Sequence, residues 1–153
     1  MQRTARLFTA LIALAGAAWG FKVTPKPGSA LIIQTGSEME WKAPTNLPTG
    51  AEYHLLREDP HTQGIQVIAR FPSKYAIPEH THTVDETIVV LRGKLRLKAG
   101  DIEKTLKAGD YAVIPAHVPH EMRADTWFRK VSILTTTNAP YDLTYTKKTP
   151  SAS

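Results

Sequence analysis

The sequence predicts a single all-β domain, built as a sandwich or a closed barrel. Short runs rich in β-branched and aromatic residues alternate with turn residues, which is typical of such folds. Beyond the N-terminal segment, no long stretch shows the apolar spacing of three and four that helices need. The length of 153 residues suits one domain. The chain contains no internal repeat and no low-complexity tract.

The expected elements follow in order from the N-terminus. Segment Phe21–Ser29 is rich in Pro, Lys and Gly and predicts a tether or an edge segment, and Ala30–Gln34 predicts a first short strand. Residues 40–50 contain Pro44 and Pro48 and should be irregular. The clearest predicted strands are Ile65–Phe71, Thr87–Leu91, Lys94–Lys98, Tyr111–Ile114 and Val131–Thr136.

Two of these strands predict different surroundings. Lys94–Lys98 alternates polar and apolar residues, so one of its faces should meet water. Ile88–Leu91 is continuously apolar, so both of its faces should be covered. A closed jelly roll provides both environments and leaves no exposed sheet edge. We therefore expect a jelly-roll β-barrel.

The N-terminus has the pattern of a secretory signal peptide. Arg3 and Arg6 precede the apolar stretch Leu7–Ala18, and small residues follow. The uncharged stretch is shorter than the roughly 20 residues of a membrane span, although an uncleaved anchor is the alternative. We expect a signal peptide over 1–20, a lead-in over 21–50, the barrel over 51–146 and a tail over 147–153. The mature protein would then be periplasmic or secreted, with no stable membrane span.

Composition excludes several kinds of chemistry. The absence of cysteine excludes disulfides, thiolate ligands and a cysteine nucleophile. The net charge of +5 is a weak bias, and the basic residues of Lys94–Lys98 have no interleaved aromatic residues for base stacking. We therefore expect no nucleic-acid partner. The sequence also lacks a phosphate-binding loop, a dinucleotide fingerprint and a Gly-x-Ser-x-Gly elbow.

Four residues predict a metal site: His80, His82, Glu86 and His120. Alternate residues of a strand point to the same face, so His80 and His82 share a direction, and Glu86 has the same parity. If the chain stays extended or forms a regular hairpin there, these three side chains can face one cavity. His120, which follows a run bounded by Gly109 and Pro115, would join them from a neighbouring strand. Three imidazoles and a carboxylate are a common ligand set for a divalent transition metal.

The same residues resemble the two motifs of the cupin superfamily. The first is His80-x-His82-x3-Glu86-x6-Gly93, and the second is Gly109-x5-Pro115-x4-His120. The resemblance implies a small β-barrel in which the three His and the Glu hold a metal. Flanking segments beginning at Trp41 and spanning Ala139–Tyr145 resemble those of secreted single-domain bacterial cupins. The sequence departs from the family at Lys74 and His117, where Gly is usual, and at Ala124, where Asn is usual.

The expected cofactor is one divalent transition metal: Fe, Mn, Ni, Co or Zn. We expect a metal-dependent enzyme that acts on a small organic molecule, of the dioxygenase, isomerase, decarboxylase or lyase type, with catalytic residues not identified. The alternative is a non-catalytic module that binds or senses a small ligand. His117 is either a surface turn residue or a contact near the metal, and Asp85 is a candidate to orient a ligand imidazole. The resemblance also implies a homodimer.

Overall fold

The computed structural model of the chain describes residues 32–146, and the expected signal peptide and C-terminal tail lie outside them. The chain divides into two units at Gln34, and every strand belongs to the unit Gln34–Ser153. Within the described residues there are strands but no helix, so none that could cross a membrane. The strands are β1 (Glu52–Glu58), β2 (Ile65–Phe71), β3 (Ala76–Thr81), β4 (Glu86–Arg92), β5 (Lys94–Ala99), β6 (Ile102–Lys107), β7 (Tyr111–Ile114), β8 (His120–Ala124), β9 (Val131–Thr136) and β10 (Thr144–Tyr145).

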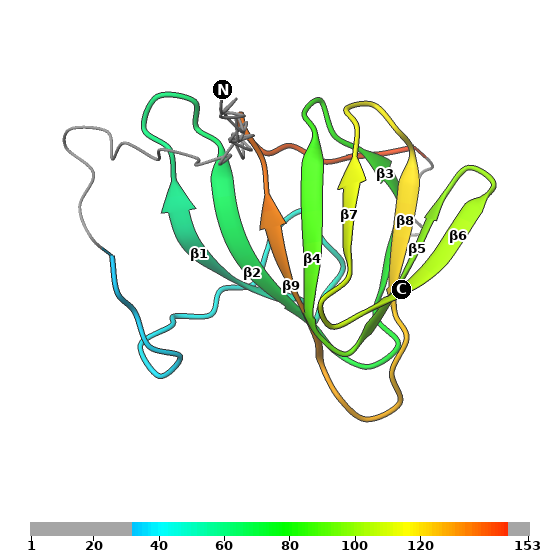
Figure 1. Cartoon of the computed structure of the whole chain (residues 1–153), viewed down its shortest axis with the longest axis horizontal. Helices are drawn as coiled ribbons and strands as arrows, with labels where there is room; N and C mark the ends of the chain where they lie inside the picture. The colour runs from blue at the N-terminus through cyan, green and yellow to red at the C-terminus, as the bar shows by residue number, and fades with distance from the viewer. Residues whose placement is uncertain (1–31, 147–153) are drawn as a thin grey trace, which may run out of the picture. The chain divides into compact units, whose positions relative to one another are not determined.

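The strands form two five-stranded sheets, as Figure 1 shows. One sheet has the order β1-β2-β9-β4-β7 and the other β10-β3-β8-β5-β6, with antiparallel pairing throughout. Neighbours in a sheet are often distant in sequence, as for β2 beside β9 and β3 beside β8. The all-β jelly-roll fold predicted from the sequence is thereby confirmed.

The core lies between the inner faces of the two sheets. Alternate residues of β2, β4 and β9 are buried, as the two-residue period of a strand requires. Ile88, Val90 and Val131 are at most 1 % exposed, and Leu95 and Met122 face them from the other sheet. Each such side chain contributes about 1.5–3 kcal/mol of hydrophobic stabilisation. The packed interior fixes the strand positions from which the site is built.

Turn residues separated the strands largely as predicted. The bounds of β2, β7 and β9 are the predicted ones, and β4 and β5 extend the predicted runs. Ile32 to Gln34 form no strand, so that part of the first predicted strand is wrong. The prediction that both faces of Ile88–Leu91 are covered is wrong at Leu91, which is 45 % exposed near the end of β4. The strand β5 alternates as predicted, with Leu95 buried and Lys94 and Lys98 exposed.

The segment before β1 lies against the barrel although it is mostly irregular. Lys42 pairs with Tyr53 in an isolated bridge. The hydroxyl of Tyr75 donates to the carbonyl of Pro48 (2.5 Å), and that of Tyr145 donates to the carbonyl of Asn46 (2.9 Å). These bonds hold residues 44–48 beside the opening of the barrel interior.

Candidate metal centre

The four predicted ligands come from both sheets. His80 lies near the end of β3, and its Cα pairs with that of His120, the first residue of β8. His82 follows the end of β3 directly. Glu86 is the first residue of β4, which belongs to the other sheet. The site therefore lies where the chain crosses from one sheet to the other.

The crossing corrects one step of the sequence argument. Glu86 does not share a face with His80 and His82 by strand parity, because β3 and β4 neither form one strand nor pair as a hairpin. Instead, the inward face of one sheet meets the inward face of the other. The predicted residues come together, but for a different reason.

The side chains converge closely. One ligating atom from each of His80, His82 and His120 lies within 4.8 Å of the other two. The Oε2 atom of Glu86 lies 3.4 Å from Nε2 of His82 and 3.5 Å from Nε2 of His120. All four residues are at most 3 % exposed.

Backbone carbonyls orient each imidazole. Nδ1 of His80 donates to the carbonyl of Pro78 (2.7 Å), and Nδ1 of His120 donates to the carbonyl of Val118 (2.9 Å). Nδ1 of His82 donates to the carbonyl of Asp142. A carbonyl oxygen can only accept, so each neutral ring carries its proton on Nδ1 and keeps its lone pair on Nε2. This is the tautomer in which an imidazole binds a metal through Nε2.

The atoms that face the centre of the cluster form no hydrogen bond. Among the described residues, Nε2 of His80, His82 and His120 and Oε2 of Glu86 are buried without a hydrogen bond. A buried polar atom left unpaired costs about 1–3 kcal/mol. One divalent cation would satisfy all four atoms, and nitrogen and carboxylate oxygen are its usual donors. The donor set fits a transition metal ion.

The pKa shifts in the cluster favour the protonation states that bind a cation at Glu86 and His80. Burial opposes ionisation of Glu86, but contacts with His120 and His82 outweigh it and lower the pKa of Glu86 to about 2. Burial and the neighbouring His120 lower the pKa of His80 to about 4. Burial acts in the same direction on His82, but the Glu86 carboxylate outweighs it and raises the pKa of His82. Near neutral pH the site thus combines an ionised carboxylate with a neutral His80.

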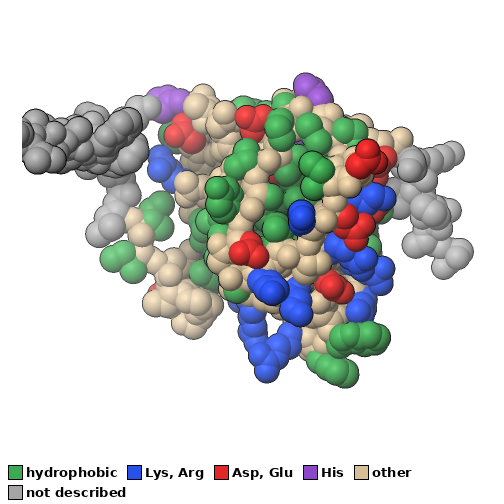
Figure 2. Space-filling view, turned by 45° about the vertical axis from the view of Figure 1, so that its right-hand side comes forward, with side chains coloured by type: hydrophobic (Ala, Val, Ile, Leu, Met, Phe, Trp, Pro, Cys, Tyr) green, Lys and Arg blue, Asp and Glu red, His purple; other side chains and the backbone are tan. Residues whose placement is uncertain are grey.

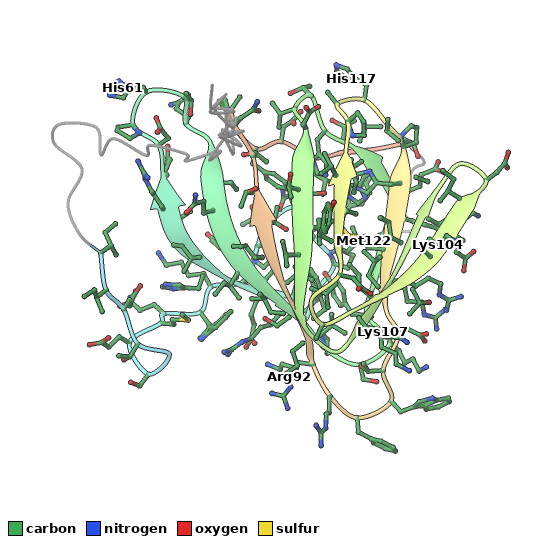
Figure 3. The ribbon with its side chains drawn as sticks, in the orientation of Figure 1. His61, Arg92, Lys104, Lys107, His117 and Met122 are labelled. Carbon is green, nitrogen blue, oxygen red and sulfur yellow. The ribbon has the colours of Figure 1, made fainter. Side chains whose placement is uncertain are left out.

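A cavity of about 480 Å³ adjoins the cluster inside the barrel. Glu86 forms part of its wall, together with inward apolar side chains from both sheets, and Met122 is labelled among them in Figure 3. The other apolar lining residues include Val67, Ala69, Phe71, Ile77 and Ile133. The volume is within the range of pockets for small organic molecules.

Tyr141 is a polar residue of this wall, packed against His82, that was not predicted from the sequence. Its ring centroid lies 4.9 Å from that of His82, and it lines the cavity beside Glu86. Burial, reinforced by the Glu86 charge, raises the pKa of Tyr141, so its phenol stays protonated. The sequence signal was the closing segment Ala139–Tyr145, but nothing in its pattern indicated which tyrosine faces inward.

Other candidates lie outside the cluster. His117 is exposed on the β7–β8 turn, at the end of the barrel seen in Figure 3, which agrees with its reading as a turn residue. Asp85 accepts a hydrogen bond from the amide of Ala116 (2.8 Å), and no such bond to an imidazole is found within the described chain. His54 is buried but bonded at both ring nitrogens, to Glu40 and Gln34, and so has a structural role.

The two departures from the family's glycines are left-handed positions. Lys74 has φ +63° and His117 has φ +65°. Glycine adopts this conformation without the steric cost that a Cβ atom adds. Both turns thus keep the backbone conformation that glycine favours, although each position has a residue with a longer side chain.

Comparison with known proteins supports the same fold. A family model described as "Cupin domain" matches residues 67–135, which include all four predicted ligands. No curated protein matches the chain.

Several solved structures resemble the chain at low identity. KdgF from Halomonas sp. is 18 % identical with a TM-score of 0.61, covering 71 % of this chain and 94 % of its own. The polyketide cyclase RemF from Streptomyces resistomycificus is 14 % identical with a TM-score of 0.67, covering 79 % and 89 %. A chain of the Rhodobacter sphaeroides complex of SigE with the anti-sigma ChrR is 21 % identical with a TM-score of 0.55, covering 67 % and 50 %. At these low sequence identities, the structural similarity shows a shared fold alone.

Proposed function

The chain belongs to the cupin superfamily, and from this premise we propose that it is a metal-dependent enzyme that acts on a small organic molecule. His80, His82, Glu86 and His120 would together hold one divalent transition metal, of which Fe, Mn, Ni, Co and Zn all accept such ligands. The observation that carries the proposal is the set of four buried acceptor atoms without a hydrogen bond beside a cavity of about 480 Å³. When bound, the ion would polarise an oxygen-bearing substrate or activate water.

The cavity defines the class of substrate. Its walls combine apolar side chains with polar ones, and of the polar ones Glu86 belongs to the buried cluster and Tyr141 packs against His82. A molecule with an apolar body and one oxygen-bearing end would place that end beside Glu86. The protonated phenol of Tyr141 would donate a hydrogen bond there. Tyr141 is therefore the hydrogen-bond donor that we assign to the reaction.

The alternative is a binding or sensing module that holds metal and ligand without turnover. The apolar part of the wall is compatible with it, as is the resemblance to the SigE–ChrR structure with a regulatory role. The resemblance to a polyketide cyclase is compatible with catalysis. Both resemblances show the fold alone. We therefore base the choice on Tyr141, whose ring lies 4.9 Å from that of His82 and which lines the same cavity as Glu86.

Metal analysis tests the first half of the proposal. The purified protein should contain close to one equivalent of a transition metal, and His82→Ala and His120→Ala should each lower its metal affinity by about a hundredfold or more. His61→Ala is the matched control, since His61 is exposed on the β1–β2 turn at a distance from the cluster. Full occupancy in both ligand variants would contradict the proposed site.

Turnover tests the second half. The metal-loaded protein should convert a member of a panel of small acids, sugars and phenolics. Tyr141→Phe should lower kcat by about a hundredfold or more while metal content stays unchanged. Saturable binding without conversion across the panel would favour the sensing module. A homodimer and a periplasmic or secreted location remain predictions, which sedimentation and cell fractionation can test.

A further inference from the structure

The loop between β8 and β9 has two large aromatic side chains that are mostly exposed to solvent. Trp127 is 76 % exposed and Phe128 is 96 % exposed. In Figure 1 this loop extends beyond the lower end of both sheets. Adjacent exposed aromatic residues at a protruding loop indicate a contact surface, because leaving such area in water forfeits its burial energy.

The loop is held in place by the residues around it. Ser73 Oγ donates to the carbonyl of Thr126 (2.5 Å), and the amide of Asp125 donates to the carbonyl of Lys94 (2.8 Å). Lys74 Nζ lies 3.9 Å from the centroid of the Trp127 ring. The fold thus presents the two rings outward, with their supporting backbone bonded on both sides.

Basic side chains surround these rings. A hollow of about 530 Å³ beside the loop is lined by Arg70, Arg92, Arg129, Lys130, Leu91 and Phe128. Lys130 pairs with Glu52 (2.5 Å) and Lys74 lies 3.9 Å from Asp125. Across residues 32–146, Arg92, Lys94 and Arg129 form no ion pair within 4.0 Å. Figure 3 places Arg92 at this lower end, and Figure 2 shows Lys and Arg side chains gathered beside projecting hydrophobic ones.

We propose that this surface, residues 125–130 with Arg92 and Lys94, docks the protein on an anionic phospholipid bilayer. Trp127 and Phe128 enter the interfacial region, where aromatic rings with such surroundings partition favourably. Arg92 and Arg129 bind lipid phosphates at the hollow, since guanidinium groups pair bidentately with phosphate oxygens. The barrel then rests on the membrane by the end opposite His61 and His117.

A bilayer fits this surface better than a nucleic acid does. Single-stranded nucleic acid is bound in a basic groove that follows the backbone past successive stacked bases. Here the two rings stand on one protruding loop, with basic side chains beside them. This is the arrangement in which apolar groups reach past the headgroups while charges stay at their level.

Labelled vesicle binding tests the proposal in the full chain. Because the chain has no cysteine, Phe128→Cys gives a unique site for an environment-sensitive fluorophore, which replaces the aromatic ring. His61→Cys, labelled in the same way, is the control. With phosphatidylglycerol-containing vesicles, the label at position 128 should shift to the blue and the label at 61 should not. Neutral phosphatidylcholine vesicles should give a much smaller shift. Equal responses at both positions, or none, would overturn the proposal.

Variants without a label measure how much the basic residues and the aromatic residues each contribute to vesicle binding. Arg92→Gln/Arg129→Gln should weaken binding to anionic vesicles about 25-fold, since each basic residue near such a surface contributes about fivefold. Trp127→Ser/Phe128→Ser should weaken it on the order of a hundredfold. Ile102→Ser and Lys104→Gln, exposed changes on β6, should have no effect. Unchanged vesicle binding in both double variants would overturn the assignment. The assignment would also be overturned if Trp127→Ser/Phe128→Ser abolished dimer formation or oligonucleotide binding while vesicle binding persisted.

Discussion

The Nε2 atoms of His82 and His120 approach the same oxygen of Glu86, at 3.4 and 3.5 Å, and neither contact is a hydrogen bond. A carboxylate in this position serves two imidazoles at once. It supplies the negative charge that a dication needs in a buried site. The relationship makes Glu86 the residue on which the charge of the site depends.

Replacing Glu86 by Gln should show how much of the metal affinity depends on the charge of this side chain and how much on its size. The amide keeps the size of the side chain but removes its charge, so we expect metal affinity to fall about ten- to a hundredfold. In the metal-free protein the pKa of His82 should also fall, because the carboxylate is what raises it. Chelator competition and an NMR titration measure the two effects. Glu103→Gln on exposed β6 is the control, and equal losses in both variants would contradict this role.

Metal affinity should decline as pH falls. A proton and the ion compete for the same Nε2 lone pair, and the raised pKa of His82 means that its proton competes at a higher pH than that of an ordinary histidine. The logarithm of the affinity should therefore fall by about one or more per pH unit below the pKa of His82. The decline should steepen near pH 4, where His80 takes up its proton. Elemental analysis after dialysis measures this, and unchanged metal content down to about pH 4 would argue against imidazole ligands.

The turn at His117 offers a test of backbone strain. Its φ of +65° disfavours any residue with a Cβ atom. His117→Gly should be more stable than His117→Ala by roughly 1 kcal/mol, although the greater freedom of glycine in the unfolded chain offsets part of the gain. Urea unfolding of the metal-free proteins measures the difference. Both variants should keep full metal content, and loss of metal in either would give His117 a part in the site.

Gly64 should tolerate no side chain. A Cβ atom there would lie 2.5 Å from the carbonyl oxygen of Thr137, which is backbone and cannot turn aside. Gly64→Ala should lower the free energy of unfolding by about 2–3 kcal/mol. Gly36→Ala is the matched control, because nothing lies within 4 Å of its added atom. Chemical denaturation compares them, and similar stabilities would contradict the close approach of β2 and the segment after β9.

The strands that could be predicted are those whose own residues carry the signal. Ile65–Phe71 and Val131–Thr136 are β-rich runs that end at turn residues, so their bounds follow from local pattern. Strand β6 could not be found in this way, because five of its six residues are exposed. It forms through pairing with β5, where Lys94 is opposite Lys107 and Ala99 is opposite Ile102. Pairing of that kind is a tertiary effect that a single run does not encode.

The candidate site likewise has a part that the sequence predicts and a part that it does not. Residue type and motif spacing predicted His80, His82, Glu86 and His120 as ligands, and the fold brings these four side chains together. The acceptors that orient the imidazoles are backbone carbonyls, and one of them, Asp142, is 60 residues from His82. A carbonyl is present at every position, so no residue type indicates which one will be used. The inward direction of Tyr141 depends on the same long-range placement.

The crossing of the chain between Thr81 and Glu86 has a consequence for motion. His80, His82 and His120 belong to one sheet and its edge, whereas Glu86 begins a strand of the other. An ion shared by these donors would cross-link the two sheets at one rim, where β3 ends and β4 and β8 begin. Removing it would let that rim open while the interior stays closed. Amide hydrogen exchange at residues 82–86 would then report whether the ion is bound, even before any substrate is known.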